Sequence, residues 1–143
     1  MVPFKVHWRG TFRVLSVTPE VGSFEFDARG KATHMGTSFL FTPLSEVQLA
    51  TGDQTAAGTI TAADGDQLFW ALVGTAIPNV AGDFQLDGEY TITGGTGRFF
   101  GATGGGTYTG TAGPAGAPEG TNDWTMTGTI SRPLEVDESN SVD

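Results

Sequence analysis

Apolar and polar residues alternate with a period of two along much of the chain. Over residues 4–14 the even positions are aromatic, aliphatic or Gly, whereas the odd positions are charged or polar. The same alternation covers residues 84–93 and 124–131. Such alternation is typical of a β-strand with one buried face. These three segments are therefore predicted to be strands with their aromatic side chains on a shared face.

Shorter strands are predicted between these three segments, and several turn signals separate them. The predicted strands 23–28 and 31–42 flank a turn at Arg29-Gly30, and Pro43 ends the second of these strands. Asp64-Gly65 is a strong hairpin signal. The shorter strands cover residues 23–28, 31–42, 47–51, 58–63, 67–76 and 103–112. With the three longer segments they make eight or nine strands, and no stretch has a helical period.

Glycine in the middle of each long strand narrows the fold class. Gly10, Gly88 and Gly128 lie on the apolar faces, where Gly marks a bend or a close approach of two backbones. Such positions help a coiled sheet to close. The sequence predicts an all-β protein, a closed eight-stranded antiparallel β-barrel, formed as one domain by residues 1–133. Residues 134–143 are acidic and rich in Ser and Asn, and are predicted to be a disordered tail.

Composition and charge exclude several functional classes. The 22 Gly and 21 Thr favour strands and tight turns over helices. A net charge of −9 repels phosphate backbones and anionic membrane surfaces, so we expect neither nucleic acid nor a membrane as a partner. Without Cys there is no disulfide, thiol catalysis or zinc–thiolate site. No apolar run reaches membrane-spanning length, and the first residues lack a signal core. We expect a cytoplasmic protein, or a secreted one if a signal peptide was removed.

The usual catalytic and cofactor motifs are missing from the sequence. There is no Gly-x-Ser-x-Gly motif, and the Gly runs at 94–97 and 104–106 lack the residues of a P-loop or a dinucleotide fingerprint. His7 and His34 have no metal-ligand spacing, and Asp64-Gly-Asp66 is interpreted as a turn. We therefore expect neither a cofactor nor a metal.

The aromatic face carries the candidate chemistry. In a closed barrel it would either fill the interior or line a cavity for a small ligand. The Trp and Tyr side chains carry polar atoms that need partners, which favours a pocket with a few polar anchors. The expected wall for an apolar ligand consists of Trp8, Phe12, Phe26, Trp70, Phe84 and Met126. The expected hydrogen-bonding or catalytic groups are Tyr90, Trp124 and His34.

One segment resembles a known family. Residues 91–104, Thr-Ile-Thr-Gly-Gly-Thr-Gly-Arg-Phe-Phe-Gly-Ala-Thr-Gly, are similar to the Gly-Gly-Thr/Ser-Gly-x-Phe segment of plant allene oxide cyclases and dirigent proteins. They are also similar to small bacterial β-barrel cyclases, the spirotetronate-type Diels–Alderases. The resemblance implies a calycin-type eight-stranded barrel with an apolar cavity, commonly assembled as a trimer. Strand edges and exposed apolar positions also lead us to expect a homo-oligomer, either a dimer or a trimer. The polar pocket residues of the plant cyclase have no matching positions here. The dirigent proteins use Asp and Arg in their pocket, whereas Arg9, Arg13, Asp87 and Glu89 fall on the charged faces of their predicted strands.

The sequence is compatible with three functions. The first is a cofactor-independent cyclase or isomerase that promotes ring closure of an apolar, polyketide-like substrate, including [4+2] cycloaddition. Such closure needs confinement and hydrogen-bond donors rather than a nucleophile. The second is a lipocalin-like carrier of a hydrophobic molecule, and the third is a packed structural barrel. The resemblance places the cyclase first, and the expected partners are a hydrophobic small molecule and further copies of the chain.

Overall fold

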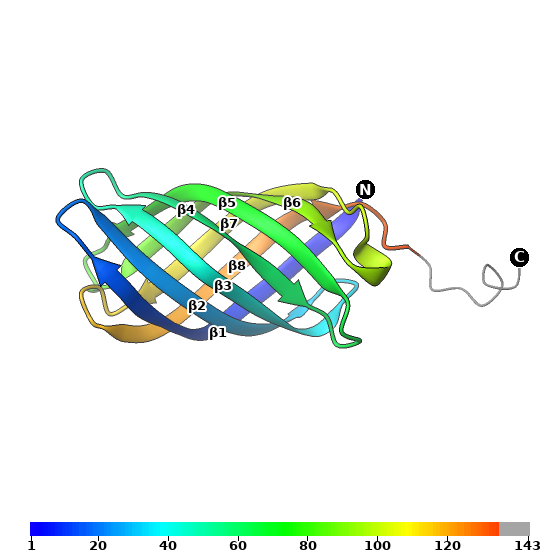
Figure 1. Ribbon diagram of the computed structural model, residues 1–143, viewed down its shortest axis with the longest axis horizontal. Coiled ribbons are helices and arrows are strands. Elements are labelled where there is room, and N and C mark those ends of the chain that lie inside the picture. The colour runs from blue at the N-terminus through cyan, green and yellow to red at the C-terminus, as the bar shows by residue number, and fades with distance from the viewer. Residues whose placement is uncertain (135–143) are drawn as a thin grey trace, which may run out of the picture.

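The computed structural model describes residues 1–134, which form a closed barrel of eight antiparallel strands (Figure 1). Each strand pairs with its neighbours in chain order, and β1 pairs with β8. The strands are β1 (Val2–Val17), β2 (Val21–Ala32), β3 (Gly36–Gln48), β4 (Asp53–Thr61), β5 (Gln67–Pro78), β6 (Phe84–Gly95), β7 (Gly104–Gly113) and β8 (Glu119–Ile130). A single 3₁₀ turn, η1 (Gly97–Phe99), lies between β6 and β7. The predicted all-β closed barrel is confirmed.

One face of each strand fills the interior. Trp8, Trp70 and Met126 are buried, whereas the outward positions of β1, such as Lys5 and Arg9, are exposed. The predicted division of the strands into an aromatic inner face and a charged outer face is therefore confirmed. Burial of these large apolar side chains is the main favourable contribution to folding.

Mid-strand glycines allow a tyrosine to cross the interior. A Cβ at Gly88 would lie 2.6 Å from the Cα of Gly74 and 2.7 Å from Cε1 of Tyr108. The Tyr108 ring therefore lies over two strands that present only hydrogen at these positions. Its hydroxyl donates a 3.0 Å hydrogen bond to Oε1 of Gln54 on β4. The close approach predicted for mid-strand glycine is thus confirmed at Gly88.

Three local predictions between β2 and β4 are wrong. Arg29 and Gly30 do not turn, because β2 continues to Ala32 and Gly30 instead faces inward, where a Cβ would meet Val6 Cγ2 at 2.9 Å. Pro43 does not end its strand but lies where the β3–β4 register shifts, a position that tolerates a residue without an N–H. Residues 47–51 form no separate strand, since β3 ends at Gln48.

The end of the described chain continues past the barrel. The backbone N–H of Ser131 donates to the carbonyl of Thr103, and that of Leu134 donates to the carbonyl of Arg98 at 2.7 Å. The rest of the tail predicted to be disordered, residues 135–143, lies outside the described residues. Within residues 1–134, no helix combines the length and apolarity that a membrane crossing requires.

The crowding at Gly88 yields a stability prediction. Gly88→Ala should lower the free energy of unfolding by about 1–3 kcal/mol, because the added methyl has no room beside Gly74 and Tyr108. Thermal denaturation would measure the loss. Thr107→Ala, an exposed position on β7, is the matched control and should melt close to the wild type. Equal melting of Gly88→Ala and the wild type would contradict the close packing.

Candidate functional site

The two ends of the barrel are built differently. At the N-terminal end lie the first residues of β1, the β2–β3 and β4–β5 turns and η1 (Figure 1). At the opposite end lie the β1–β2, β3–β4 and β5–β6 turns and the loop from β7 to β8. A ligand that enters along the barrel axis must pass one of these two sets of connections.

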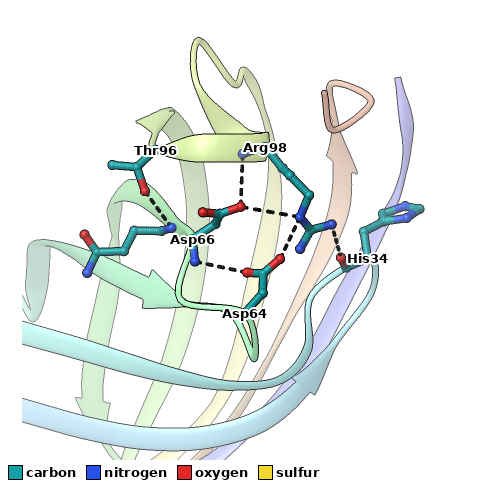
Figure 2. A network of polar contacts seen from close by, with 6 residues as sticks. His34, Asp64, Asp66, Thr96 and Arg98 are labelled. Carbon is teal, nitrogen blue, oxygen red and sulfur yellow. Dashed lines mark hydrogen bonds and ion pairs between the residues drawn. The ribbon is translucent and has the colours of Figure 1, made fainter. Parts of the chain in front are cut away.

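A polar network around Arg98 ties together the connections of the N-terminal end (Figure 2). Nε of Arg98 donates to Asp64 at 2.8 Å and lies 3.5 Å from Asp66, while Nη1 donates to the His34 carbonyl at 3.3 Å. The backbone N–H of Arg98 also donates to Asp66 at 3.1 Å. We call Arg98, Asp64 and Asp66 the latch. It links the β2–β3 turn, the β4–β5 turn and η1.

Apolar side chains lie beneath the latch. Phe99 of η1 is buried, with the Arg98 guanidinium 4.9 Å from its ring centroid, and Met35 and Ala102 are also buried. Gly97 has φ of +55°, in the left-handed region, and a Cβ there would collide with the carboxylate of Asp66. The glycines of segment 91–104 therefore allow a backbone conformation that other residues would not fit. The hydrogen bonds of Arg98 and the packing of Phe99 close this end of the barrel.

The opposite end contains an apolar cavity of about 410 Å³, a size within the range of small-molecule pockets. Val17 and Leu49 on its rim are 63% and 42% exposed, so the cavity is accessible from solvent. We call it the mouth. Its lining is Phe12, Val14, Val17, Gly22, Phe24, Leu49, Phe84, Gly116, Ala117 and Pro118.

A layer of phenylalanine rings forms the floor of the mouth. The ring centroid of Phe24 lies 6.1 Å from that of Phe12 and 6.1 Å from that of Phe84, both edge to face. Phe26 stacks on Phe12 at 5.7 Å. Below this layer are two small voids of about 10 Å³ each, close to the volume that admits one water. The middle of the barrel is therefore packed, and the apolar cavity lies above the phenylalanine layer.

A buried polar group lies just below the phenylalanine layer. Gln54 is 5% exposed and Ser45 is 1% exposed, and the Gln54 amide donates a 3.1 Å hydrogen bond to Oγ of Ser45. Tyr108 completes the group by donating to Gln54. We call these three residues the inner polar group. Burial raises the pKa of Tyr108, with the Asp87 charge adding to the effect, so its phenol stays protonated and can donate.

The expected wall residues all face the interior but divide among several places. Phe12 and Phe84 line the mouth, and Phe26 and Trp70 line the small voids. Trp8 and Met126 are fully buried elsewhere in the core. The expected wall residues therefore lie partly in the packed middle of the barrel and partly around the mouth.

The expected hydrogen-bonding residues do not form one site. Nε1 of Trp124 donates to Asn122 at 3.0 Å, while the Tyr90 hydroxyl is buried without a partner among residues 1–134. Desolvation raises the pKa of Tyr90 to about 12, so it can donate a proton in a hydrogen bond but cannot act as a base near neutrality. His34 is exposed in the β2–β3 turn, at φ of +69°, with its ring 3.1 Å from the Pro3 carbonyl. It lies at the closed end and outside the barrel (Figure 2).

No group of three or more His, Asp or Glu side chains in residues 1–134 is arranged to hold a metal ion. Comparison of the chain with protein-family models, with curated proteins and with solved structures found no match. The resemblance of residues 91–104 to the cyclase and dirigent families, and the expected homo-oligomer, therefore remain predictions.

The latch yields a prediction of stability and pH dependence. Arg98→Met should lower the melting temperature at pH 7, because it leaves Asp64 and Asp66 without their cation. The pKa of Asp64 is lowered, first by a hydrogen bond from the Asp66 backbone and also by Arg98. A carboxyl with a lowered folded-state pKa stabilises the fold above its ordinary value of 3.8 and loses that effect as the pH falls. The difference between Arg98→Met and the wild type should therefore shrink below pH 3.8.

Thermal melts at pH 7 and at about pH 2.5 would measure both effects. Arg132→Met, which removes an exposed Arg outside the latch, is the control and should not show them. A difference for Arg98→Met that is the same at both pH values would contradict the role of the Asp64 carboxylate.

Proposed function

We propose that the protein binds a small hydrophobic molecule in the mouth of the barrel. The observation that carries the proposal is the contrast between the two ends, since the mouth is an apolar cavity of about 410 Å³ whereas the latch and Phe99 close the N-terminal end. Two other surface hollows, of about 440 and 500 Å³, are lined mainly by charged and polar side chains, so the apolar lining of the mouth distinguishes it rather than its size. Transfer of an apolar ligand into such a lining is favourable. The wall there consists of aliphatic and aromatic side chains and small residues.

Binding fits the arrangement of polar groups better than hydrolysis or group transfer does. The mouth lining contains no titratable side chain, so it offers no nucleophile, general acid or general base. Specificity would come from the shape of the apolar wall and from the backbone of residues 116–118 at its edge. This is the function of a carrier or sequestering protein.

Ring closure of the bound molecule is the second candidate. Three buried donors without partners among residues 1–134 favour it, Nε1 of Trp8, Nε1 of Trp70 and the Tyr90 hydroxyl. A donor near a substrate carbonyl would polarise it, and confinement would bring reacting carbons together. Incubation with linear polyenes that carry a carbonyl, followed by product analysis, separates the two candidates. An unchanged substrate that is nonetheless bound supports a carrier.

A charge placed at the rim tests the mouth directly. Leu49→Arg should weaken the binding of the neutral fluorophore N-phenyl-1-naphthylamine about tenfold or more, because an apolar wall residue is replaced by a cation. Leu49 lies in the β3–β4 turn and is partly exposed, so the fold should tolerate the change. Fluorescence titration would measure the affinity.

The matched control is Val73→Arg, an exposed apolar position on the outer face of β5. It adds the same charge away from the mouth and should leave the affinity unchanged. Equal loss of binding in both variants, or no binding of the fluorophore to the wild type, would overturn the proposed site.

A further inference from the structure

The mouth continues inward toward the inner polar group. One of the two small voids, here called the first void, lies directly under the phenylalanine layer. It shares Phe12, Phe24 and Phe84 with the wall of the mouth. The other small void, here called the second void, is lined by Trp70 and shares Gln54 with the first void. Only the phenylalanine layer therefore separates the apolar cavity from the Gln54 amide.

A buried donor without a partner belongs to a residue that lines the second void. Nε1 of Trp70 has no hydrogen-bond partner among residues 1–134, although Trp70 is only 1% exposed, and its side chain lines the second void. A buried N–H without a partner is costly, and most such groups in folded proteins are satisfied. The Gln54 amide has a second N–H besides the one that it donates to Ser45. The second void is thus lined by two residues, Trp70 and Gln54, that each carry an N–H group beyond those bonded within residues 1–134.

The chemistry of these groups favours a neutral acceptor. The buried polar side chains of residues 1–134 are Ser, Thr, Gln and Asn, so no buried cation is present to compensate a carboxylate. An unpaired ionised group in such surroundings is strongly disfavoured. A carbonyl or hydroxyl oxygen needs only hydrogen bonds, and Trp70 and Gln54 can supply them.

We propose that the ligand of the mouth is an elongated apolar molecule with one neutral oxygen-bearing end, a carbonyl or a hydroxyl, which passes the phenylalanine layer and is bound by Trp70 and Gln54. This inference rests on the proposed function and adds the class of ligand and its orientation. The hydrocarbon part occupies the mouth. The rings of Phe12, Phe24 and Phe84 must separate to admit the polar end, since the voids below them are close to the size of a water.

Competition with the bound fluorophore tests the class of ligand. Decan-2-one and decan-1-ol should displace N-phenyl-1-naphthylamine at concentrations at least tenfold lower than decanoate at pH 8, because only decanoate must bury an ionised group. Decane measures the contribution of the hydrocarbon alone. Decanoate that competes as well as the ketone would overturn the proposal without affecting binding at the mouth.

Variants of Trp70 and Trp8 test the inner site. Trp70→Phe removes the unpartnered N–H and should reduce the advantage of decan-2-one over decane about threefold to tenfold. Trp8→Phe is the matched control, since Nε1 of Trp8 is also buried without a partner among residues 1–134 but Trp8 lines neither the mouth nor the two voids. Trp8→Phe should keep the full advantage, and an equal change in both variants would contradict the assignment.

The outcomes separate the two proposals. If the fluorophore does not bind to the wild type, or binds equally to the Leu49→Arg variant, the proposed function fails. If decane and decan-2-one both bind with an affinity ratio that Trp70→Phe leaves unchanged, the mouth binds apolar molecules but the inner polar group does not select them. Should Trp70→Phe fail to fold, Gln54→Met provides a second removal of a donor, and the ligand series on the wild type still decides the class.

Discussion

Twelve residue pairs, from Val2–Ile130 to Arg13–Glu119, join β1 to β8 and turn a meander of strands into a closed barrel. Closure leaves no unpaired strand edge, and it fixes which face of every strand is inside. Because side chains alternate with a period of two, a shift of one residue in this pairing would exchange the aromatic and charged faces. The apolar interior, the glycine-lined path of Tyr108 and the mouth all depend on it.

The filling of the interior then creates the structural difference between the two ends. At the N-terminal end, Phe99 and the Arg98 latch complete the closure. In the middle, Trp8, Trp70 and Tyr108 occupy the space at high density, with voids no larger than about 10 Å³. Toward the opposite end the ring layer stops below the turns, and the space above it is the mouth. The proposed binding function thus follows from where the large side chains end.

The strands and their inner faces could be predicted from sequence because period-two alternation reports directly on burial. The turn at Arg29-Gly30 was predicted wrongly because a glycine that relieves crowding inside a strand resembles a turn glycine. The inner polar group was missed for a related reason. Gln54 fell outside the predicted strand 58–63, although β4 begins at Asp53. Tyr108 lies on the inner face of β7, and its neighbours on that face are glycines. Alternation with Thr was the only sequence signal that its side chain is buried.

The mouth itself could not be located from sequence. Phe12 and Phe84 were expected in a ligand wall, but so were Trp8 and Met126, which lie in the packed core. Alternation distinguishes inside from outside but carries no information on position along the axis. That position depends on the stagger of all eight strands, which is a long-range property. His34 was expected as a hydrogen-bond donor within the predicted strand 31–42, but it lies in the β2–β3 turn at the closed end.

The central claim is that an apolar ligand enters and binds at the mouth, and not at the latch or on the outer face of the barrel. The most direct measurement is a titration of the ¹⁵N-labelled protein with N-phenyl-1-naphthylamine, followed by the backbone amide chemical shifts. We predict saturable changes that are largest at Val14, Val17, Leu49 and Ala117 and negligible at Asp64 and Arg98. Saturable changes centred on the latch or on the outer face of the strands, or no saturable change at all, would contradict the claim.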